Sequence, residues 1–184
     1  MTSGKKILAI CGSTRKDSSN HRLIRAIADL VADTMQLTLY DGLTDLPHFN
    51  PDQGDDHEPR AVHAFRQAIR DADGLLICTP EYAHGVPGSL KNAIDWTIST
   101  GDFSHKPTVL ITASTDGRLG HAALLETLKV IEAENIDGLQ LLVPFIRTKV
   151  GEDDTITDAA TLTAVKQLMQ DFLATMNEQA RGMP

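Results

Sequence analysis

A short polar segment holds the residues of this chain best suited to binding a ligand. Residues 12–20 read GSTRKDSSN and lie between the apolar run KKILAIC and the helix-like stretch HRLIRAIADLVAD. Ser18 or Ser19 can cap the following helix, but one cap explains only one hydroxyl. Five side chains can each donate a hydrogen bond, and Arg15 adds a charge-assisted one: Ser13, Thr14, Ser18, Ser19 and Asn20. Together with the free N–H groups of a helix start, they predict a phosphate site, the alternative being a polar capping loop without a ligand.

The spacing of this segment limits the kind of phosphate. It lacks the GxxxxGK[ST] pattern that holds a nucleoside triphosphate with Mg²⁺. It also lacks GxGxxG, whose second glycine lets a pyrophosphate approach the backbone. Hydroxyl and amide donors on several sides suit a terminal phosphate monoester.

Two further segments could complete a site. TPEYAHGVPGSLKNAIDW, residues 79–96, forms a rigid connector between Pro80 and Pro87, in which the N–H groups of 81 to 84 are expected to point outward. Tyr82 offers a planar face to a ring, although an ordinary half-exposed loop aromatic is the alternative. Trp96 is expected in the core or in a subunit interface. STDGRLGH, residues 114–121, is a glycine-bearing turn that could close the same crevice.

Alternating elements must position these segments. Strand-length apolar runs alternate with stretches in which apolar residues recur every 3.6 residues. The predicted strands are 5–11, 35–40, 74–79, 107–113 and 138–143, and the predicted helices are 19–33, 58–72, 87–99, 119–134 and 158–178. This alternation predicts an α/β fold in three layers, with a parallel sheet covered on both faces.

The right-handed crossover rule favours the strand order 2-1-3-4-5, in which the order reverses between the first and third strands. Ligands bind outside the carboxyl ends of such strands. The rule selects the loops 12–20, 80–88 and 114–120, which are the three segments described above.

Composition narrows the function further. The 184 residues suit a single domain, 1–184, and the net charge of −8 argues against a nucleic-acid partner. No segment is long and apolar enough for a signal peptide or a membrane span, so a cytoplasmic protein is expected. Cys11 and Cys78 lie in apolar runs and are expected to be buried, reduced thiols.

No metal site is predicted. Asp55, Asp56, His57 and Glu58 are the candidate ligands, but adjacent residues rarely converge on one ion. The segment 44–60 is instead expected to be a solvated loop near the mouth of the site.

Three motifs resemble those of a known family. GSTRKDSSNHRL is similar to GSxRxxSxNxxL, PEYAHGVPGSLKNAIDW to PEYNxSxPGxLKNAIDW, and STDGRLGH to SxxGxxGG. These are motifs of the NADPH-dependent FMN reductase family, whose members have a flavodoxin-like fold and include quinone, azo-dye and chromate reductases. The motifs occur in the family's order, and the first two together are highly specific.

The resemblance implies FMN as cofactor and assigns residues to it. The phosphate would be held by the first motif, the isoalloxazine would be lined mainly through backbone groups of the second, and its other edge would face the third. The implied residues are, in turn, Ser13, Arg15, Ser18, Ser19 and Asn20; Pro80, Glu81, Tyr82, Ala83 and His84; and Ser114 and Gly117. Three departures from the motifs are expected to affect substrate contacts or flavin affinity: Ala83 in place of Asn, His84 after it, and His121 in place of the second glycine.

The function implied is an NAD(P)H-dependent reductase that passes two electrons through the flavin N5 to a small-molecule acceptor by a ping-pong route. No side chain is then required for acid–base catalysis, and Tyr82 and His84 are candidates for shaping the acceptor pocket. A flavodoxin-type electron carrier is the main alternative, although such carriers clamp the flavin between aromatics and this chain has 4% aromatic residues. A phosphate-binding protein without flavin is another. Apolar residues on several helices, and the resemblance, predict a homodimer or homotetramer.

Overall fold

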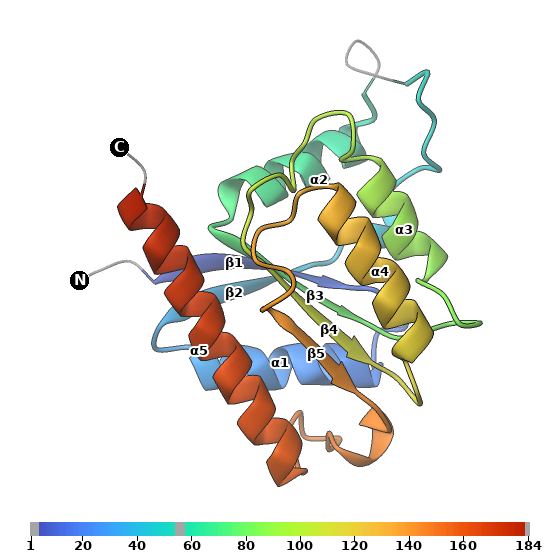
Figure 1. The fold of residues 1–184 in the computed structure, drawn as a ribbon. Helices are drawn as coiled ribbons and strands as arrows, with labels where there is room; N and C mark the ends of the chain where they lie inside the picture. The colour runs from blue at the N-terminus through green and yellow to red at the C-terminus, as the bar shows by residue number, and fades with distance from the viewer. Residues whose placement is uncertain (1–3, 54–57, 183–184) are drawn as a thin grey trace.

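The computed structural model describes residues 4–53 and 58–182 and has the predicted topology (Figure 1). Five parallel strands form one sheet in the order β2-β1-β3-β4-β5. The strands are β1 (Lys5–Cys11), β2 (Met35–Tyr40), β3 (Gly74–Thr79), β4 (Thr108–Ala113) and β5 (Gln140–Val143). The helices are α1 (Ser19–Val31), α2 (Arg60–Asp71), α3 (Gly88–Asp95), α4 (Arg118–Val130) and α5 (Ala159–Gly182), with short 3-10 turns η1 (Leu43–Asp45) and η3 (Ile146–Thr148).

Helices cover both faces of the sheet. The alternation of side chains along β1 divides the core, since Ile7 and Ala9 pack with apolar residues of α1 and α5. Leu8 and Ile10 point to the opposite face and pack with α2, α3 and α4. Every residue of β3 is buried, which explains its nearly unbroken apolar sequence. The result is the predicted three-layer arrangement (Figure 1).

α3 and α4 each end four residues earlier than their sequence patterns predict. α4 ends at Val130, because the N–H groups of Glu132 and Ala133 donate to the carbonyls of Lys129 and Leu128, both at 3.0 Å. Glu132 has a φ of 60°, so this is a Schellman cap with glutamate at the position that usually holds glycine.

α3 ends at Asp95 rather than at residue 99, because the N–H groups of Thr97 and Ile98 donate to the carbonyls three residues back, those of Ile94 at 2.9 Å and Asp95 at 3.3 Å. The carbonyl of Trp96 accepts a hydrogen bond from Nε of Arg66 in α2, at 2.8 Å, which holds the turn that follows the helix. Trp96 itself is 1% exposed and donates its indole N–H to the Pro47 carbonyl at 2.8 Å, so it belongs to the core of this chain.

The parallel strands bring their carboxyl ends to one edge of the sheet. The segments after β1, β3, β4 and β5 therefore all start there. Gly12, the first of these residues, donates its N–H to the Cys78 carbonyl at 2.9 Å, and a Cβ at Gly12 would lie 2.1 Å from Thr79 Oγ1. This close approach joins the first loop to the end of β3.

No described helix is both long and apolar enough to cross a bilayer. Cys11 and Cys78 are free and buried, as predicted. Of the residues considered as metal ligands, 55–57 lie outside the described ranges. Glu58 accepts from Nδ1 of His63 at 2.9 Å and pairs with Arg66.

Candidate functional site

A cleft of about 350 Å³ lies at the carboxyl edge of the sheet. It brings together nine of the predicted site residues: Ser13, Arg15, Ser18, Ser19, Asn20, Pro80, Glu81, Tyr82 and Ser114. Ala83, His84 and Gly117 are not among the lining residues, whereas Thr115, Ile146 and Arg147 line the cleft without having been predicted. The three loops selected from the sequence therefore meet at one site.

Ser13 and Ser18 stabilise the first loop, residues 12–20, which was predicted to bind phosphate. Ser18 caps α1, since its Oγ accepts from the N–H of His21 at 3.2 Å, and Ser13 Oγ accepts from the N–H of Arg15 at 3.4 Å. Both serines are buried. Among the described residues, the Arg15 guanidinium and the Ser19 hydroxyl have no hydrogen-bond partner within the chain. These two groups, the first N–H groups of α1 and the O–H of Ser13, which only accepts in its contact with Arg15, are donors available to a ligand.

Asn20 connects three elements. Its amide Nδ2 donates to the Ala113 carbonyl at the end of β4, at 3.1 Å, and its Oδ1 accepts from the Cys78 thiol of β3, at 3.3 Å. The residue is 4% exposed. Its side-chain amide thus fixes the start of α1 against the sheet. Asn20 also lines the cleft.

A neutral pair lies beneath the same loop. The Cys11 thiol is 3.4 Å from Nδ1 of His21, which is also 2.9 Å from Ser18 Oγ. Burial raises the pKa of Cys11 to about 11. Burial, followed by the nearby charge of Arg25, lowers the pKa of His21. Neither group is charged at neutral pH, so the positive charge that lines the cleft comes from Arg15 and Arg147.

The second loop is fixed by contacts to the third. The N–H of Glu81 donates to Ser114 Oγ at 3.2 Å, and the Glu81 carboxylate accepts from the N–H of Gly120, in the first turn of α4, at 2.6 Å. The Tyr82 N–H donates to the Gly85 carbonyl at 3.1 Å. The expectation that these two N–H groups point outward is therefore wrong, and of the predicted set only those of Ala83 and His84 are left for a ligand.

The tip of the second loop is a tight hairpin turn. Tyr82 and Gly85 exchange two backbone hydrogen bonds, and the intervening Ala83 and His84 have φ values of 49° and 61°. Two consecutive positive φ values are those of a type I′ turn. His84 Nδ1 lies 3.5 Å from Oε1 of Glu81, while the Tyr82 side chain is 56% exposed beside the cleft.

The third loop depends on Gly117, which has a φ of 93° and precedes α4. A Cβ there would also lie 2.9 Å from Leu142 Cδ1. His121, one of the departures from the motifs, does not reach the cleft: its ring nitrogens contact Thr112 Oγ1 at 2.9 Å and Gln140 Oε1 at 2.8 Å. His121 therefore joins α4 to the strands β4 and β5, and the expectation that it contacts a bound ligand is corrected.

Arg147 and Ile146 belong to a fourth loop, which follows β5. The Ile146 N–H donates to the Ser114 carbonyl at 3.1 Å, so this loop is joined to the third. The carboxyl-end rule applies to β5 as it does to the other strands, but the sequence after β5 has no glycine- or hydroxyl-rich signature. The available signal was an arginine four residues after the predicted strand 138–143.

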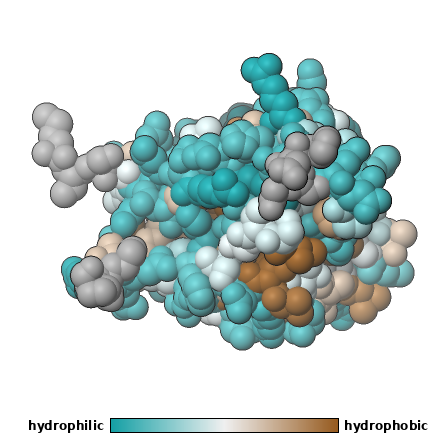
Figure 2. Space-filling model, turned by 90° about the horizontal axis from the view of Figure 1, so that it is seen from above, coloured by the Kyte–Doolittle hydropathy of each residue, from teal (hydrophilic) through white to brown (hydrophobic). Residues whose placement is uncertain are grey.

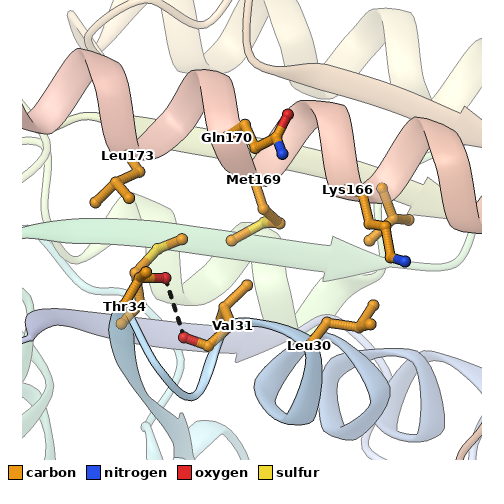
Figure 3. Close-up of a pocket in the computed structure, with 9 residues that line it drawn as sticks. Leu30, Val31, Thr34, Lys166, Met169, Gln170 and Leu173 are labelled. Carbon is orange, nitrogen blue, oxygen red and sulfur yellow. Dashed lines mark hydrogen bonds between the residues drawn. The ribbon is translucent and has the colours of Figure 1, made fainter.

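A second hollow, of about 330 Å³, lies between α1 and α5 (Figure 3). Its lining includes Leu30, Val31, Met169 and Leu173, and the hydrogen bond from Thr34 Oγ1 to the Val31 carbonyl, at 3.2 Å, lies at its border. None of the predicted site residues lines it. The cleft at the carboxyl edge therefore remains the candidate site.

The residues of that cleft fit a phosphate monoester joined to a planar ring. The first loop contributes hydroxyl, guanidinium and helix N–H donors around Arg15 and Ser19. The second and third loops contribute Pro80, Tyr82 and Thr115, which offer flat and small surfaces. This set of donors suits one phosphate group of a ligand, which agrees with the absence of the pyrophosphate and triphosphate sequence patterns.

Comparison with known proteins gives a consistent result. The family model described as NADPH-dependent FMN reductase matches residues 5–145. A quinone reductase of Escherichia coli K12 is 32% identical over 170 residues, which cover 88% of this chain and 90% of the relative. An NAD(P)H-dependent FMN reductase of Pseudomonas aeruginosa is 32% identical over 176 residues, covering 92% of this chain and 94% of the relative.

A solved structure shows the same fold. The flavoenzyme NAD(P)H:(acceptor) oxidoreductase FerB of Paracoccus denitrificans superposes with a TM-score of 0.76 at 24% identity, over 95% of this chain and 98% of that chain. The match of the family model over most of the sequence, together with the two relatives, shows that the chain belongs to the NADPH-dependent FMN reductase family.

Proposed function

We propose that this NAD(P)H-dependent FMN oxidoreductase reduces quinones and azo compounds, with free flavins as further acceptors. The observation that carries the proposal is the single cleft in which the phosphate-type donors of the first loop meet the second and third loops. Relatives support the acceptor class. A 2-hydroxy-1,4-benzoquinone reductase of Burkholderia sp. is 45% identical over 120 residues, and an NADPH azoreductase of a Bacillus strain is 33% identical over 120 residues.

The residues of the cleft divide between the two ends of FMN. Arg15, Ser19 and the first N–H groups of α1 would hold the phosphate, while Ser13, Ser18 and Asn20 keep the loop in place. Pro80, Glu81, Tyr82 and Ser114 would line the ring, with Ala83, His84 and Gly117 supplying the shape of the two loops. FMN held by these residues would supply the redox chemistry, which is hydride acceptance from the nicotinamide and transfer of two electrons to the acceptor.

The protein has little chemistry of its own to supply. Its residues would bind and orient the ring beside the exposed Tyr82, and the Glu81 carboxylate is held by the N–H of Gly120 in α4. We assign no acid–base side chain. Tyr82 and His84 would shape the acceptor pocket. A flavodoxin-type carrier is not favoured, because the family consists of NAD(P)H-dependent reductases.

The phosphate assignment is tested by Arg15→Gln, with Lys16→Gln as the control of equal charge. Loss of one charge-assisted hydrogen bond to phosphate is expected to raise the dissociation constant of FMN about tenfold or more. Lys16 does not line the cleft, so Lys16→Gln should leave that constant within about twofold. Quenching of flavin fluorescence measures both. Equal weakening by the two substitutions would show that general charge, rather than the Arg15 contact, holds the cofactor.

We also propose that the chain forms a homodimer or homotetramer, as a single FMN-binding domain in a reducing cytoplasm. Exposed apolar side chains support association: Ile98, Leu119, Val130 and Phe145 are each more than half exposed. Figure 2 shows the molecule from above the view of Figure 1. This face is mostly hydrophilic but carries a compact hydrophobic area. Light scattering should give two or four times 20.0 kDa, and a mass of 20.0 kDa at micromolar concentration would contradict association. The two free cysteines agree with a reducing compartment.

A further inference from the structure

A second polar hollow adjoins the cofactor cleft. It has a volume of about 430 Å³ and lies between the first loop, α1 and the segment that joins η3 to α5. The cleft and this hollow share Arg15, Ser19 and Arg147. Arg22, on the second turn of α1, lines the hollow but not the cleft. We call this feature the arginine hollow, defined by Arg15, Arg22 and Arg147 with the hydroxyls of Ser19 and Thr157.

The charges of the arginine hollow are not balanced by ion pairs. Within residues 4–53 and 58–182, no carboxylate lies within 4.0 Å of the guanidinium of Arg15, Arg22 or Arg147. Arg25, one turn further along α1, is by contrast 2.6 Å from Asp154.

Three further arginines are paired in the same way, whereas no ion pair among the described residues includes Arg60 or Arg181. Arg66, Arg70 and Arg118 each lie within 4.0 Å of a carboxylate. Asp17 and Glu152 also line the hollow, so its formal charge is three minus two, or +1. On a chain of net charge −8 the hollow is therefore positive, and Arg22 and Arg147 stay available to a ligand once Arg15 holds the cofactor phosphate.

The phosphate of one FMN does not account for all three arginines. The donors of the first loop already suffice for a single phosphate monoester, and Arg22 lies outside the cleft that would hold it. The planar guanidinium binds phosphate oxygens through two parallel hydrogen bonds, and hydroxyls complete such a site. A second phosphate monoester is the ligand chemistry that this set suits.

NADPH carries such a group, the 2′-phosphate of its adenosine, and NADH does not. The nicotinamide has to reach the ring end of the cleft, so the adenosine end of the same molecule must occupy other space. We propose that the arginine hollow binds the 2′-phosphate of NADPH and that Arg22 and Arg147 determine the preference for NADPH over NADH. The inference rests on the proposed function, since it assigns a subsite for its reductant.

Arg22→Gln tests the assignment, with Lys16→Gln again as the control that removes the same charge outside the hollow. In FMN-loaded protein, Arg22→Gln is expected to raise the KM for NADPH about tenfold and to leave the KM for NADH within about twofold. Calorimetric titration with 2′,5′-ADP should show the same loss of affinity, while 5′-AMP binds wild type and variant alike. Lys16→Gln should change none of these quantities.

Three results would overturn the inference. The first is an equal effect of Arg22→Gln on NADPH and NADH, and the second is unchanged binding of 2′,5′-ADP. The third is loss of FMN from Arg22→Gln, seen in its visible spectrum, which would assign Arg22 to the cofactor's own phosphate. Arg22→Lys, which keeps the charge but not the planar fork, should lie between wild type and Arg22→Gln if the variant folds.

The same experiments separate this inference from the proposed function. FMN-loaded wild type that neither NADPH nor NADH reduces would contradict the proposed function. Titration with 2′,5′-ADP does not depend on reduction, and it would still decide whether the arginine hollow binds a 2′-phosphate.

Discussion

Two residues of the loop after β3 have backbone conformations that are unusual for their residue types. Ala83 and His84 have positive φ values at the tip of the second loop, where asparagine and glycine are favoured. An alanine in the left-handed region costs roughly 1–2 kcal/mol. The rigidity of the turn thus comes from the two backbone hydrogen bonds between Tyr82 and Gly85 rather than from its central residues.

Replacing Ala83 with asparagine should therefore stabilise the protein. We expect Ala83→Asn to raise the free energy of unfolding by about 1 kcal/mol, because asparagine tolerates the left-handed region. Ala122→Asn, on the exposed face of α4, should lower it by about 0.5 kcal/mol, since asparagine is a poorer helix former. Urea denaturation measures both, and destabilisation by both substitutions would contradict the assigned turn.

The buried thiol of Cys11 should make stability depend on alkaline pH. Its pKa is raised by burial from 9.0 to about 11, so the unfolded chain loses this proton first as the pH rises. Stability from this thiol is full below pH 9.0 and is lost between 9.0 and about 11. Between pH 8 and 10, wild type should lose about 1 kcal/mol more unfolding free energy than Cys11→Ser. Identical losses in the two proteins would place the thiol in a solvated site.

At the scale of elements, the contacts that end helices and join loops come from residues distant in sequence. The strand boundaries of β1, β2 and β3 agree with the prediction, because continuous apolar runs define buried strands. The turn after α3 is held by Arg66, which lies 30 positions before its partner carbonyl, and α4 ends with a glutamate in place of glycine. Neither signal is visible in local periodicity.

The buried Arg66 should be a large contributor to stability. Its side chain is 5% exposed and binds the Trp96 carbonyl, Glu58 and, at 3.7 Å, the Asp102 carboxylate. Arg66→Met leaves two partly buried carboxylates short of a partner, and it should cost about 3–5 kcal/mol of unfolding free energy.

The exposed pair between Lys91 and Asp95 provides the comparison for Arg66. Lys91→Met should cost less than about 1 kcal/mol, because an exposed ion pair gains little. Chemical denaturation of both variants, followed by the circular dichroism of the whole protein, decides the question. A small loss for Arg66→Met would mean that the network is not a structural anchor of α3.

At the scale of the whole molecule, the parallel topology brings separate sequence signals together. Strand alternation and the crossover rule predicted the order of the sheet, and that order placed the loops after β1, β3 and β4 at one edge. The fourth loop, with Arg147, was not predicted because its sequence resembles an ordinary connector. Side-chain partners such as that of Asn20, which reaches 93 positions along the chain, follow only from the folded arrangement.

The central claim is that the cleft at the carboxyl edge holds FMN in a form that NAD(P)H reduces. The most direct measurement is the visible spectrum of the purified, FMN-loaded protein before and after anaerobic addition of NADPH. The structure predicts a bound flavin whose absorption bands bleach within the time of mixing. A bound flavin that NADPH leaves oxidised would contradict the reductase and favour an electron carrier, and a protein that fails to retain FMN would contradict the assignment of the cleft.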